Sequence, residues 1–312
     1  MTSTPTTDPG TFVHVGWNIQ HGWRLADALD QMRRFAQEHG AERPQLLTLQ
    51  ELQEGQAQIV ANEFGLTAVE APNMRPGSRN ALFFAPELFE ADPEWVGYPD
   101  EIRHRPATAK LTTIHPSGAR SRRQLSVASV HLAFGNPQHR DHQTRWVLAN
   151  MYKDNELLFD QGDRNSWTDW GAPLTLDNVQ DKNFVVDRSI ILPDGSSQPD
   201  VMPHRIMEIR ELVELGRYAA TILGQAGADR STTWDGPKKH RQRIPAADCP
   251  PGGLSAIDRT YVAPDLVEAL VSATIPAEPQ VQAVSDHLPQ VTVWNTRRWW
   301  EVVNAEVETI RH

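Results

Sequence analysis

The sequence predicts an α/β domain, and three observations point to this class. The chain opens with apolar β-type runs alternating with amphipathic helical runs, in the order β-α-β-α, between residues 12 and 64. Short strand-type runs separated by turn residues make up much of the chain after residue 64. Several of these runs end in a polar residue that can bind a metal or a phosphate. Because ligands bind outside the carboxyl ends of strands in α/β sheets, we expect these strand ends to meet at one pocket.

The first four elements follow from the spacing of apolar residues. Residues 12–17 alternate weakly and predict a strand, and residues 46–49 predict a short buried strand. Residues 24–39 carry apolar side chains at helical spacing, and residues 54–64 suit a second helix. Gly40 and Gly65 follow these helices and are expected to end them. Polar residues, Asn18 and Glu51, therefore fall at the ends of the two strands.

The later elements are predicted in the same way. Strands are expected over residues 81–84, 107–114, 125–132, 157–159, 257–262, 281–284 and 290–294. Helices are expected over residues 140–152 and 206–223, with a hairpin turn at residues 116–118. Residues 172–203 and 235–253 are rich in turn formers, which predicts two long loops. No repeat or dividing linker is visible, so we predict a disordered tail over residues 1–10 and a single domain over residues 11–312.

Composition excludes several classes of protein. Lys and Arg number 30 against 40 Asp and Glu, a formal charge of −10, which argues against a protein that coats DNA by bulk charge. The single Cys249 excludes an internal disulfide. No apolar run approaches the roughly 18 residues needed to span a membrane. The N-terminus lacks the basic start and apolar core of a secretory signal, so a cytoplasmic location is expected.

Positive charge is concentrated in two acid-free stretches. One lies between residues 102 and 140, and the other lies between residues 238 and 243. Each stretch has two interpretations: it forms solvated loops, or it attracts an anionic substrate. The sequence does not choose between them. The cations are Arg103, Arg105, Lys110, Arg120, Arg122, Arg123 and Arg140 in the first stretch, and Lys238, Lys239, Arg241 and Arg243 in the second.

Six short segments, in this order, carry a family resemblance. They are Trp17–Asn18–Ile19, Leu49–Gln50–Glu51, Ser129–Val130–His131–Leu132, Gly162–Asp163–Arg164–Asn165, Ile257–Asp258–Arg259 with the following Thr260–Tyr261–Val262, and Ser285–Asp286–His287–Leu288–Pro289. Thr233–Trp234 adds a weaker match. Together they resemble the endonuclease/exonuclease/phosphatase (DNase I-like) superfamily across almost the whole chain. The resemblance implies a four-layer α/β sandwich of two mixed sheets face to face, flanked by helices.

The residues also suit the hydrolysis of a phosphate ester. A hard cation such as Mg²⁺, with Mn²⁺ as a substitute, prefers carboxylate oxygen, so Glu51 is the first expected metal ligand, with Asn18 and Asp286 beside it or one water away. His287 is the expected base or phosphate-stabilising cation, oriented by Asp258. Asp163 would prepare the attacking water. The remaining expected catalytic groups are Asn165, which would hold the water or a phosphoryl oxygen, and His131, which would donate to the phosphate or leaving group.

The same residues also have purely structural interpretations. Without the resemblance, Glu51 would be a charge at a helix N-terminus and Asp258 the partner of Arg259. Asp163 and Asn165 also suit an Asx turn, although an extended segment would aim both at one pocket. Arg105, Arg164 and Trp167 are expected substrate-binding residues. Arg164 is a departure from the family's usual aromatic residue and could instead reach a neighbouring carboxylate, and Trp167 could instead pack.

The sequence therefore predicts a Mg²⁺-dependent phosphodiester hydrolase, a nuclease acting on DNA or RNA. One alternative is a phosphomonoesterase or a phosphodiesterase of small molecules or lipid headgroups at the same site. The other is a non-catalytic binding scaffold. The sequence does not choose between DNA and RNA, endo and exo action, one metal and two, or oligomeric states.

Overall fold

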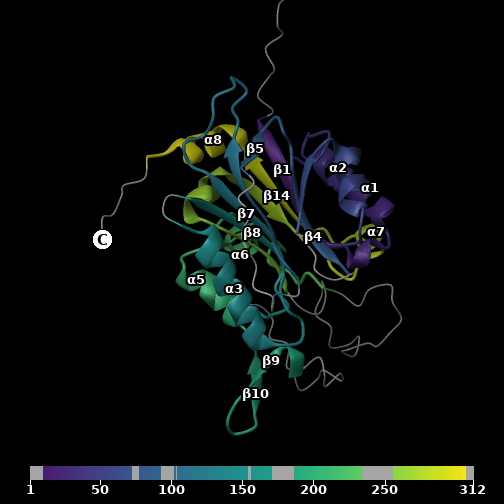
Figure 1. The fold of residues 1–312 in the computed structure, drawn as a ribbon, viewed down its shortest axis with the longest axis vertical. Helices are drawn as coiled ribbons and strands as arrows, with labels where there is room; N and C mark the ends of the chain where they lie inside the picture. Colours follow the sequence, from purple (N-terminus) through teal and green to yellow (C-terminus); the bar gives the residue numbers. More distant parts are fainter. Residues whose placement is uncertain are drawn as a thin grey trace, which may run out of the picture.

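Two six-stranded mixed sheets pack face to face, and helices cover their outer surfaces (Figure 1). The structure is a computed structural model and describes residues 10–71, 77–92, 102, 104–153, 156–170, 186–233 and 256–306. This arrangement is the predicted four-layer α/β sandwich. Three buried apolar clusters correspond to its interfaces: one beneath each outer helical layer and one between the sheets.

The first sheet has the strand order β13-β14-β1-β2-β4-β3. Its central pair, β1 and β2, is parallel, and β1 also pairs antiparallel with β14. Buried side chains of the outer helices, such as Phe35 and Val60, pack on Trp17 and its neighbours. The bounds are β1 (Thr11–Asn18), β2 (Leu46–Leu52), β3 (Thr67–Glu70), β4 (Arg79–Phe84), β13 (Leu270–Thr274) and β14 (Gln290–Asn295), with η1 (Gln20–Gly22), α1 (Leu25–Glu38), α2 (Gln56–Phe64) and α7 (Pro279–Gln282).

The second sheet has the order β11-β12-β8-β7-β6-β5, with β7 and β8 parallel. Helices α3 and α5 pack on its outer face. The bounds are β5 (Phe89–Asp92), β6 (Ala107–Thr113), β7 (Leu125–His131), β8 (Leu157–Asp163), β11 (Val213–Glu214) and β12 (Asp258–Val262). The other elements are α3 (Pro137–Met151), the hairpin β9 (Ser189–Ile191) with β10 (Ser197–Pro199), α5 (Met202–Ile209), α6 (Leu215–Thr221), η4 (Pro264–Ala269) and α8 (Thr296–Asn304).

The space between the sheets is apolar at one end and polar at the other. Alternate residues of a strand face the same side, and the inward residues change character along every central strand. In β8 they run from Leu157 and Phe159 to Gln161 and Asp163. The other series are Phe12, His14, Gly16 and Asn18; Leu46, Thr48 and Gln50; Leu125, Val127, Ser129 and His131; Val262, Thr260 and Asp258; and Trp294, Thr292 and Gln290. The fold thus gathers polar side chains at one end of a dry core.

Buried hydrogen bonds keep this polar end ordered. His14 contacts the hydroxyls of Thr48 and Thr292 at 2.8 and 3.1 Å, and burial lowers its pKa to about 3. The Gln50 amide donates to Gln161 across the gap between the sheets. Gly16 makes room for that glutamine, because a Cβ at this position would lie 2.2 Å from the Gln161 side chain. Polar groups so far from water need such partners.

Several predicted elements are confirmed with small shifts in their ends. These include the strands and helices between residues 12 and 64, the later strands up to β8, the helix α3, and β12 and β14. The hairpin turn at residues 116–118 is also present, since the His115 N–H donates to the Ala119 carbonyl. Strands β3, β5 and β13 and helix α8 were not predicted. Of the two long loops, residues 235–253 lie outside the described residues, together with residues 1–9, Trp234, Cys249 and the second basic stretch.

Three predictions were wrong. The single helix over residues 206–223 is instead α5, β11 and α6, because Glu211 adopts a left-handed φ of +59° that ends α5. Residues 281–284 are not a strand, since Pro279 starts the short helix α7 there and Val281 packs inward. The expected loop over residues 172–203 contains β9, β10 and the first two residues of α5 in its described part.

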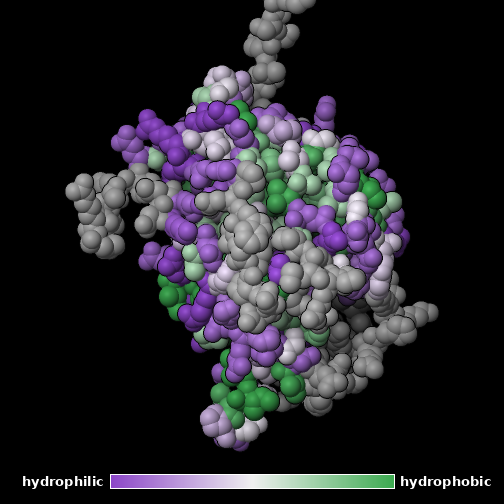
Figure 2. All heavy atoms as spheres, viewed as in Figure 1, coloured by the Kyte–Doolittle hydropathy of each residue, from purple (hydrophilic) through white to green (hydrophobic). Residues whose placement is uncertain are grey.

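The face seen in Figure 2 is mainly hydrophilic, with apolar side chains gathered at the end that carries the β9–β10 hairpin. Ile191 of β9 and Val186, three residues before that strand, are 59% and 54% exposed. Within the described residues, no helix has both the length and the apolar character needed to cross a membrane.

Candidate active site

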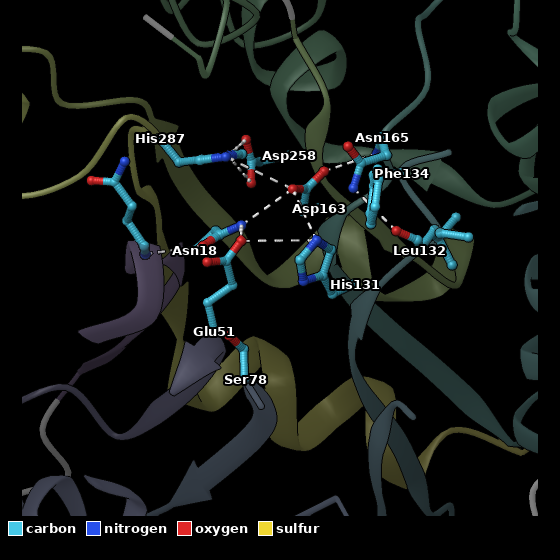
Figure 3. A network of polar contacts seen from close by, with 12 residues as sticks. Asn18, Glu51, Ser78, His131, Leu132, Phe134, Asp163, Asn165, Asp258 and His287 are labelled. Atoms are coloured by element: carbon cyan, nitrogen blue, oxygen red, sulfur yellow. Dashed lines mark hydrogen bonds and ion pairs between the residues drawn. The ribbon is translucent and has the colours of Figure 1, made fainter. Parts of the chain in front are cut away.

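The polar end of the inter-sheet space brings together side chains from six segments (Figure 3). Asn18 ends β1, Glu51 lies near the end of β2, and His131 and Asp163 end the parallel strands β7 and β8. Asp258 begins β12, which runs antiparallel to β8 and pairs it directly with Asp163. His287 precedes β14. The predicted convergence of the strand ends is therefore what the structure shows.

Glu51 reaches the site because the β2 backbone is irregular there. Its φ is +63°, and the pairing with β4 shifts between Leu49 and Leu52. A left-handed non-glycine residue costs about 1–2 kcal/mol, a strain found chiefly at functional sites. Regular alternation would have turned Glu51 with Leu49 toward the outer helices. Burial tends to raise the pKa of Glu51, but the charges of His131, His287 and His21 outweigh burial, and the pKa lies below its ordinary value.

Asn18 links the two halves of the site. Its Nδ2 donates to Glu51 Oε1 at 3.1 Å and to Asp163 Oδ2 at 3.2 Å. Its Oδ1 accepts the Gln20 backbone N–H at 3.1 Å. Asn18 therefore lies beside Glu51, as predicted, but presents its NH₂ group to the carboxylates. Its amide oxygen, the atom that a metal would use, faces the Gln20 backbone.

His287 and Asp258 form a hydrogen-bonded pair. His287 Nδ1 lies 2.9 and 3.1 Å from the two Asp258 oxygens, as the predicted orienting role requires. Burial alone would lower the pKa of His287, but the nearby charges of Asp258 and Asp163 raise it well above its ordinary value. His287 is thus an imidazolium at neutral pH. Its backbone is fixed by Trp17, whose indole N–H donates to the His287 carbonyl at 2.9 Å, and by Ser285 Oγ, which accepts the His287 N–H.

Asp163 lies between two imidazoles. Its Oδ2 is 3.5 Å from His131 Nε2 and 3.8 Å from His287 Nε2, and only 2% of the residue is exposed. Burial favours the neutral acid, but the charges of His287 and His131 prevail, so the pKa of Asp163 is lowered. The carboxylate is therefore ionised at neutral pH and can accept a hydrogen bond from water. The ring of His104 stacks on His131 with centroids 4.6 Å apart.

Asn165 is held in one orientation from two sides. Its Nδ2 donates to the Leu132 carbonyl at 3.1 Å, and its Oδ1 accepts from Arg188 Nη2 at 2.6 Å. Its φ is +49° and its N–H donates to Asp163 Oδ1, so Asp163 and Asn165 form an Asx turn. The expected extended geometry of this segment was wrong, although the turn still places both side chains at the site (Figure 3).

The three expected substrate-binding residues do not share one location in the structure. Arg164 is buried and pairs with Asp160 at 2.8 Å, and Trp167 is 7% exposed with its indole N–H bound to the Arg188 carbonyl. Neither faces the site, so both expectations were wrong, and in each case the packing alternative holds. Arg105 is half-buried and follows His104, which stacks on His131, so its role stays a prediction. Asp286 is 41% exposed, with Oδ1 4.0 Å from His287 Nε2.

The acid-free stretch between residues 102 and 140 is not an open basic track. Acids from distant parts of the chain neutralise most of its described cations. The pairs are Lys110 with Glu156, Arg120 with Glu90, Arg122 with Glu306, Arg123 with Asp265, and Arg140 with Asp200. The attraction of an anionic substrate by this stretch was therefore the wrong reading of these five residues.

The donor set suits a divalent cation. Asp163, Asp258 and His287 bring potential ligand atoms within 4.8 Å of one another. His287 Nδ1 is already bound to Asp258, however, and a protonated imidazole has no lone pair for a metal. The carboxylates of Glu51 and Asp163, bridged by the Asn18 amide, are the chemically suitable oxygen ligands for a hard cation.

Sequence reasoning missed several residues of this network. Thr232 Oγ1 accepts the backbone N–H groups of Ile257 and Asp258 and so positions the start of β12. Arg188 comes from the expected structureless loop, and nothing in the local sequence marks it. His21 contacts Glu51, and its place three residues after Asn18 was a usable signal.

No protein-family model matches the chain, and no curated protein matches it by sequence. Solved structures match its fold. An endonuclease/exonuclease/phosphatase from Bacteroides vulgatus aligns with a TM-score of 0.57 and 16% identity, covering 91% of this chain and 98% of the other. An AP endonuclease from Archaeoglobus fulgidus and D. rerio TDP2 complexed with a single-strand DNA product each align with a TM-score of 0.55 and 15% identity, covering 91% of this chain and 99% of theirs. These likenesses confirm the predicted fold.

Proposed function

We propose that this chain, which has the endonuclease/exonuclease/phosphatase (DNase I-like) fold, is a hydrolase of phosphate esters that depends on a divalent cation. The observation that carries the proposal is the unbroken network from Asp258 through His287, Asp163 and Asn18 to Glu51. It combines an ionised buried carboxylate, an imidazolium fixed by a second carboxylate, and an oxygen donor for a metal. Hydrolysis of a phosphate ester needs an activated water, a charge sink for the phosphoryl oxygens and help for the leaving oxygen, and these groups can supply them.

Each side chain has a role that follows from its contacts. Asp163 orients the attacking water and accepts its proton, because its lowered pKa keeps it ionised. The His287 imidazolium stabilises the charge that develops on the phosphoryl oxygens, and Asp258 holds its ring in place. Asn165 has one amide hydrogen on the Leu132 carbonyl and the other available to the phosphate. His131, on the far side of Asp163, donates to the phosphate or the leaving oxygen.

Glu51 would hold the divalent ion, with Asp286 reaching it through water and the Asp163 carboxylate close by on the other side of Asn18. Mg²⁺, or Mn²⁺ in its place, would supply Lewis-acid charge to a phosphoryl oxygen when bound. Asn18 acts on this chemistry indirectly, because its NH₂ group fixes the two carboxylates relative to one another.

Nucleic acid is the proposed substrate, and two fold neighbours support it. One is an AP endonuclease and the other was solved with a single-strand DNA product. A second candidate is a small phosphorylated molecule, a lipid headgroup included. The pairing of the cations between residues 102 and 140 favours it, since a compact substrate needs no long basic track. A panel of DNA, RNA, nucleotides, sugar phosphates and lipid phosphates, assayed with Mg²⁺ and with Mn²⁺, separates the two.

Glu51→Gln tests the proposal directly. It keeps the shape of the side chain and removes the charge that a metal requires, so we expect at least a 100-fold loss of metal-dependent turnover with the fold retained by circular dichroism. Glu54→Gln is the matched control, because that side chain is 86% exposed and lies three residues further on. Full activity of Glu51→Gln would reject the metal role. Absence of wild-type turnover on the whole panel would favour the non-catalytic scaffold.

A further inference from the structure

The backbone after β1 takes an unusual course next to Glu51. Gln20, His21 and Gly22 have φ values of 48°, 58° and 59°, three left-handed residues in succession. Two of them carry side chains, and each such residue costs roughly 1–3 kcal/mol unless the surrounding structure holds it. Strain of this kind marks segments whose position matters, and this one brings His21 onto the Glu51 carboxylate.

His21 contacts Glu51 with both its backbone and its ring. The backbone N–H donates to Glu51 Oε2 at 3.1 Å, and ring Nδ1 lies 3.2 Å from the same oxygen. The Ser78 hydroxyl lies 2.6 Å from Nδ1, and the ring packs against Trp23. The His21 side chain is 42% exposed and that of Glu51 is 15% exposed, so both can be reached from solvent.

We propose that His21 Nδ1 is a ligand, together with Glu51, of the divalent ion at this site, and that it biases the site toward Mn²⁺ over Mg²⁺. The inference rests on the proposed function, because it concerns the ion that Glu51 holds. Nδ1 and Glu51 Oε2 lie 3.2 Å apart, so without a metal a proton on Nδ1 lies between them, and a divalent ion bound by both atoms would displace that proton. Two ligands at right angles on one ion, with bonds of about 2.1 Å, lie roughly 3.0 Å apart.

The choice of ion follows from the donor types. Mg²⁺ prefers oxygen and binds proteins through carboxylates and retained waters. First-row transition ions accept imidazole nitrogen more readily, so one histidine among oxygen donors shifts relative affinity toward them. The backbone N–H of His21 keeps its bond to Glu51 while the ring contacts the ion. The Ser78 side chain, whose hydroxyl contacts Nδ1 at 2.6 Å, would rotate to release that nitrogen.

Spectroscopy of Mn²⁺ bound to the full chain tests the proposal without relying on turnover. Electron spin-echo envelope modulation detects a ¹⁴N nucleus bonded to Mn²⁺, and titrations followed by calorimetry give the affinities for Mn²⁺ and Mg²⁺. His21→Asn is the main variant because asparagine tolerates left-handed backbone and can still contact Ser78. We expect it to lose the imidazole modulation and to weaken Mn²⁺ binding at least tenfold, with Mg²⁺ binding changed less than about threefold. His139→Ala, an exposed histidine on α3, is the control and should match the wild type.

The outcomes separate this inference from the proposed function. Modulation that persists in His21→Asn, or an unchanged ratio of Mn²⁺ to Mg²⁺ affinity, overturns the role of His21. Mn²⁺ bound without any nitrogen modulation in the wild type overturns it as well, yet leaves a metal at Glu51 intact. Wild-type affinity in Glu51→Gln overturns the metal site itself, and His21 as its ligand with it.

Discussion

A histidine packs against each face of strand β12, and the pKa values of the two histidines are shifted in opposite directions. On the inner face, Asp258 binds His287 Nδ1 at 2.9 Å. On the outer face, the Tyr261 hydroxyl contacts His204 Nδ1 at 2.6 Å beneath α5. His204 Nε2 accepts the indole N–H of Trp170 at 3.0 Å, so the neutral ring is hydrogen-bonded at both nitrogens.

Burial acts on both rings alike, so the difference comes from the neighbouring charges. Burial is the largest influence on His204 and lowers its pKa to about 4, with Arg259 and Arg217 acting in the same direction and Asp169 opposing them. Burial also opposes the charged form of His287, but Asp258 and Asp163 reverse the direction and raise its pKa. His204 also has carboxylates 3.3 Å from Nε2, those of Asp169 and Glu208, but these side chains are 36% and 40% exposed. The carboxylates of Asp258 and Asp163 that face His287 are buried. The charge of each ring therefore depends on how deeply its carboxylates are buried and on whether cations oppose them. The surroundings of His287 favour the charged ring, and those of His204 favour the neutral ring.

Asp258→Asn should produce the largest loss of kcat. It tests most directly whether the charge of His287 distinguishes the inner face from the outer face. The amide keeps the shape of the side chain but removes the charge that holds His287 as an oriented imidazolium. Loss of the orienting carboxylate from a histidine pair costs about 10⁴-fold in kcat in serine proteases, and we expect a loss of about 10³- to 10⁴-fold here. Steady-state kinetics on the active substrate provides the measurement.

Tyr261→Phe is the control on the opposite face of the same strand. It removes the hydroxyl from His204 and leaves Asp258 in place, so kcat should change less than about threefold. A loss in Asp258→Asn no larger than that of Tyr261→Phe would show that the two faces do not differ in function.

Asp160→Asn is the second prediction and should affect stability rather than activity. Asp160 and Arg164 form a pair on the outer face at 2.8 Å, with side chains 1% and 3% exposed. Removing one partner leaves the other charge buried, so the free energy of unfolding should fall by about 3–5 kcal/mol. Urea denaturation measures this loss, and kcat per folded molecule should stay within about threefold. An equally stable variant would mean that Arg164 finds another partner.

The inner and outer faces also differ in how far the sequence reveals them. The six segments that contain Asn18, Glu51, His131, Asp163, Asp258 and His287 predicted a shared site, because each lies at or next to the end of an apolar strand. The fold layers followed from the same segments. The roles of Arg164 and Trp167 were not predicted, since both follow Asp163 closely in sequence, yet Arg164 turns back to pair with Asp160 on the outer face and Trp167 is buried with its indole N–H on the Arg188 carbonyl. Proximity in sequence does not determine which side of a strand a residue faces.

The remaining failures have local physical causes. A left-handed residue at Glu211 divides a segment whose apolar spacing predicted one helix. The left-handed φ of Glu51 turns that residue into the site, against the alternation of its strand. Arg188 reaches Asn165 only because the β9–β10 hairpin folds back, which is a long-range contact with no local pattern. Such positions depend on tertiary structure, which overrides local preference.

Arg188→Met is the third prediction. It tests whether the segment that precedes β9 contributes to the active site through Arg188. Arg188 is the donor to Asn165 Oδ1, so its loss leaves the amide free to turn its oxygen toward the phosphate. We expect kcat to fall by roughly 30- to 100-fold with a smaller change in KM, as for a group that acts mainly in the transition state. Arg188→Lys should restore part of the activity.

Arg205→Met is the matched control for the loss of a cation. Arg205 lies on α5 with a side chain 55% exposed, so its removal should change kcat by less than about twofold. If Arg188→Met has no effect in the wild type, or the same effect in an Asn165→Ala background, Arg188 does not act through Asn165.

His204→Gln and His287→Gln form the last and smallest prediction, which concerns stability against pH. The native pKa of His204, about 4, lies below its ordinary 6.5, so between these values the unfolded chain binds a proton that the native chain does not. The stability contributed by neutral His204 is full above about pH 6.5 and falls by about 2 kcal/mol at about pH 5. His204→Gln should therefore lose less stability than the wild type when acidified.

His287 has the opposite sign. Its native pKa is raised, so its stabilisation is full below its ordinary value of 6.5 and disappears as pH rises through the native pKa. His287→Gln should therefore lose more stability on acidification than the wild type. Urea denaturation of the three proteins at about pH 8 and about pH 5 measures both differences, and taking them relative to the wild type cancels the contribution of His14, which is common to all three. If both variants lost more stability than the wild type on acidification, or both lost less, the neighbouring charges would not set the pKa values of these two rings.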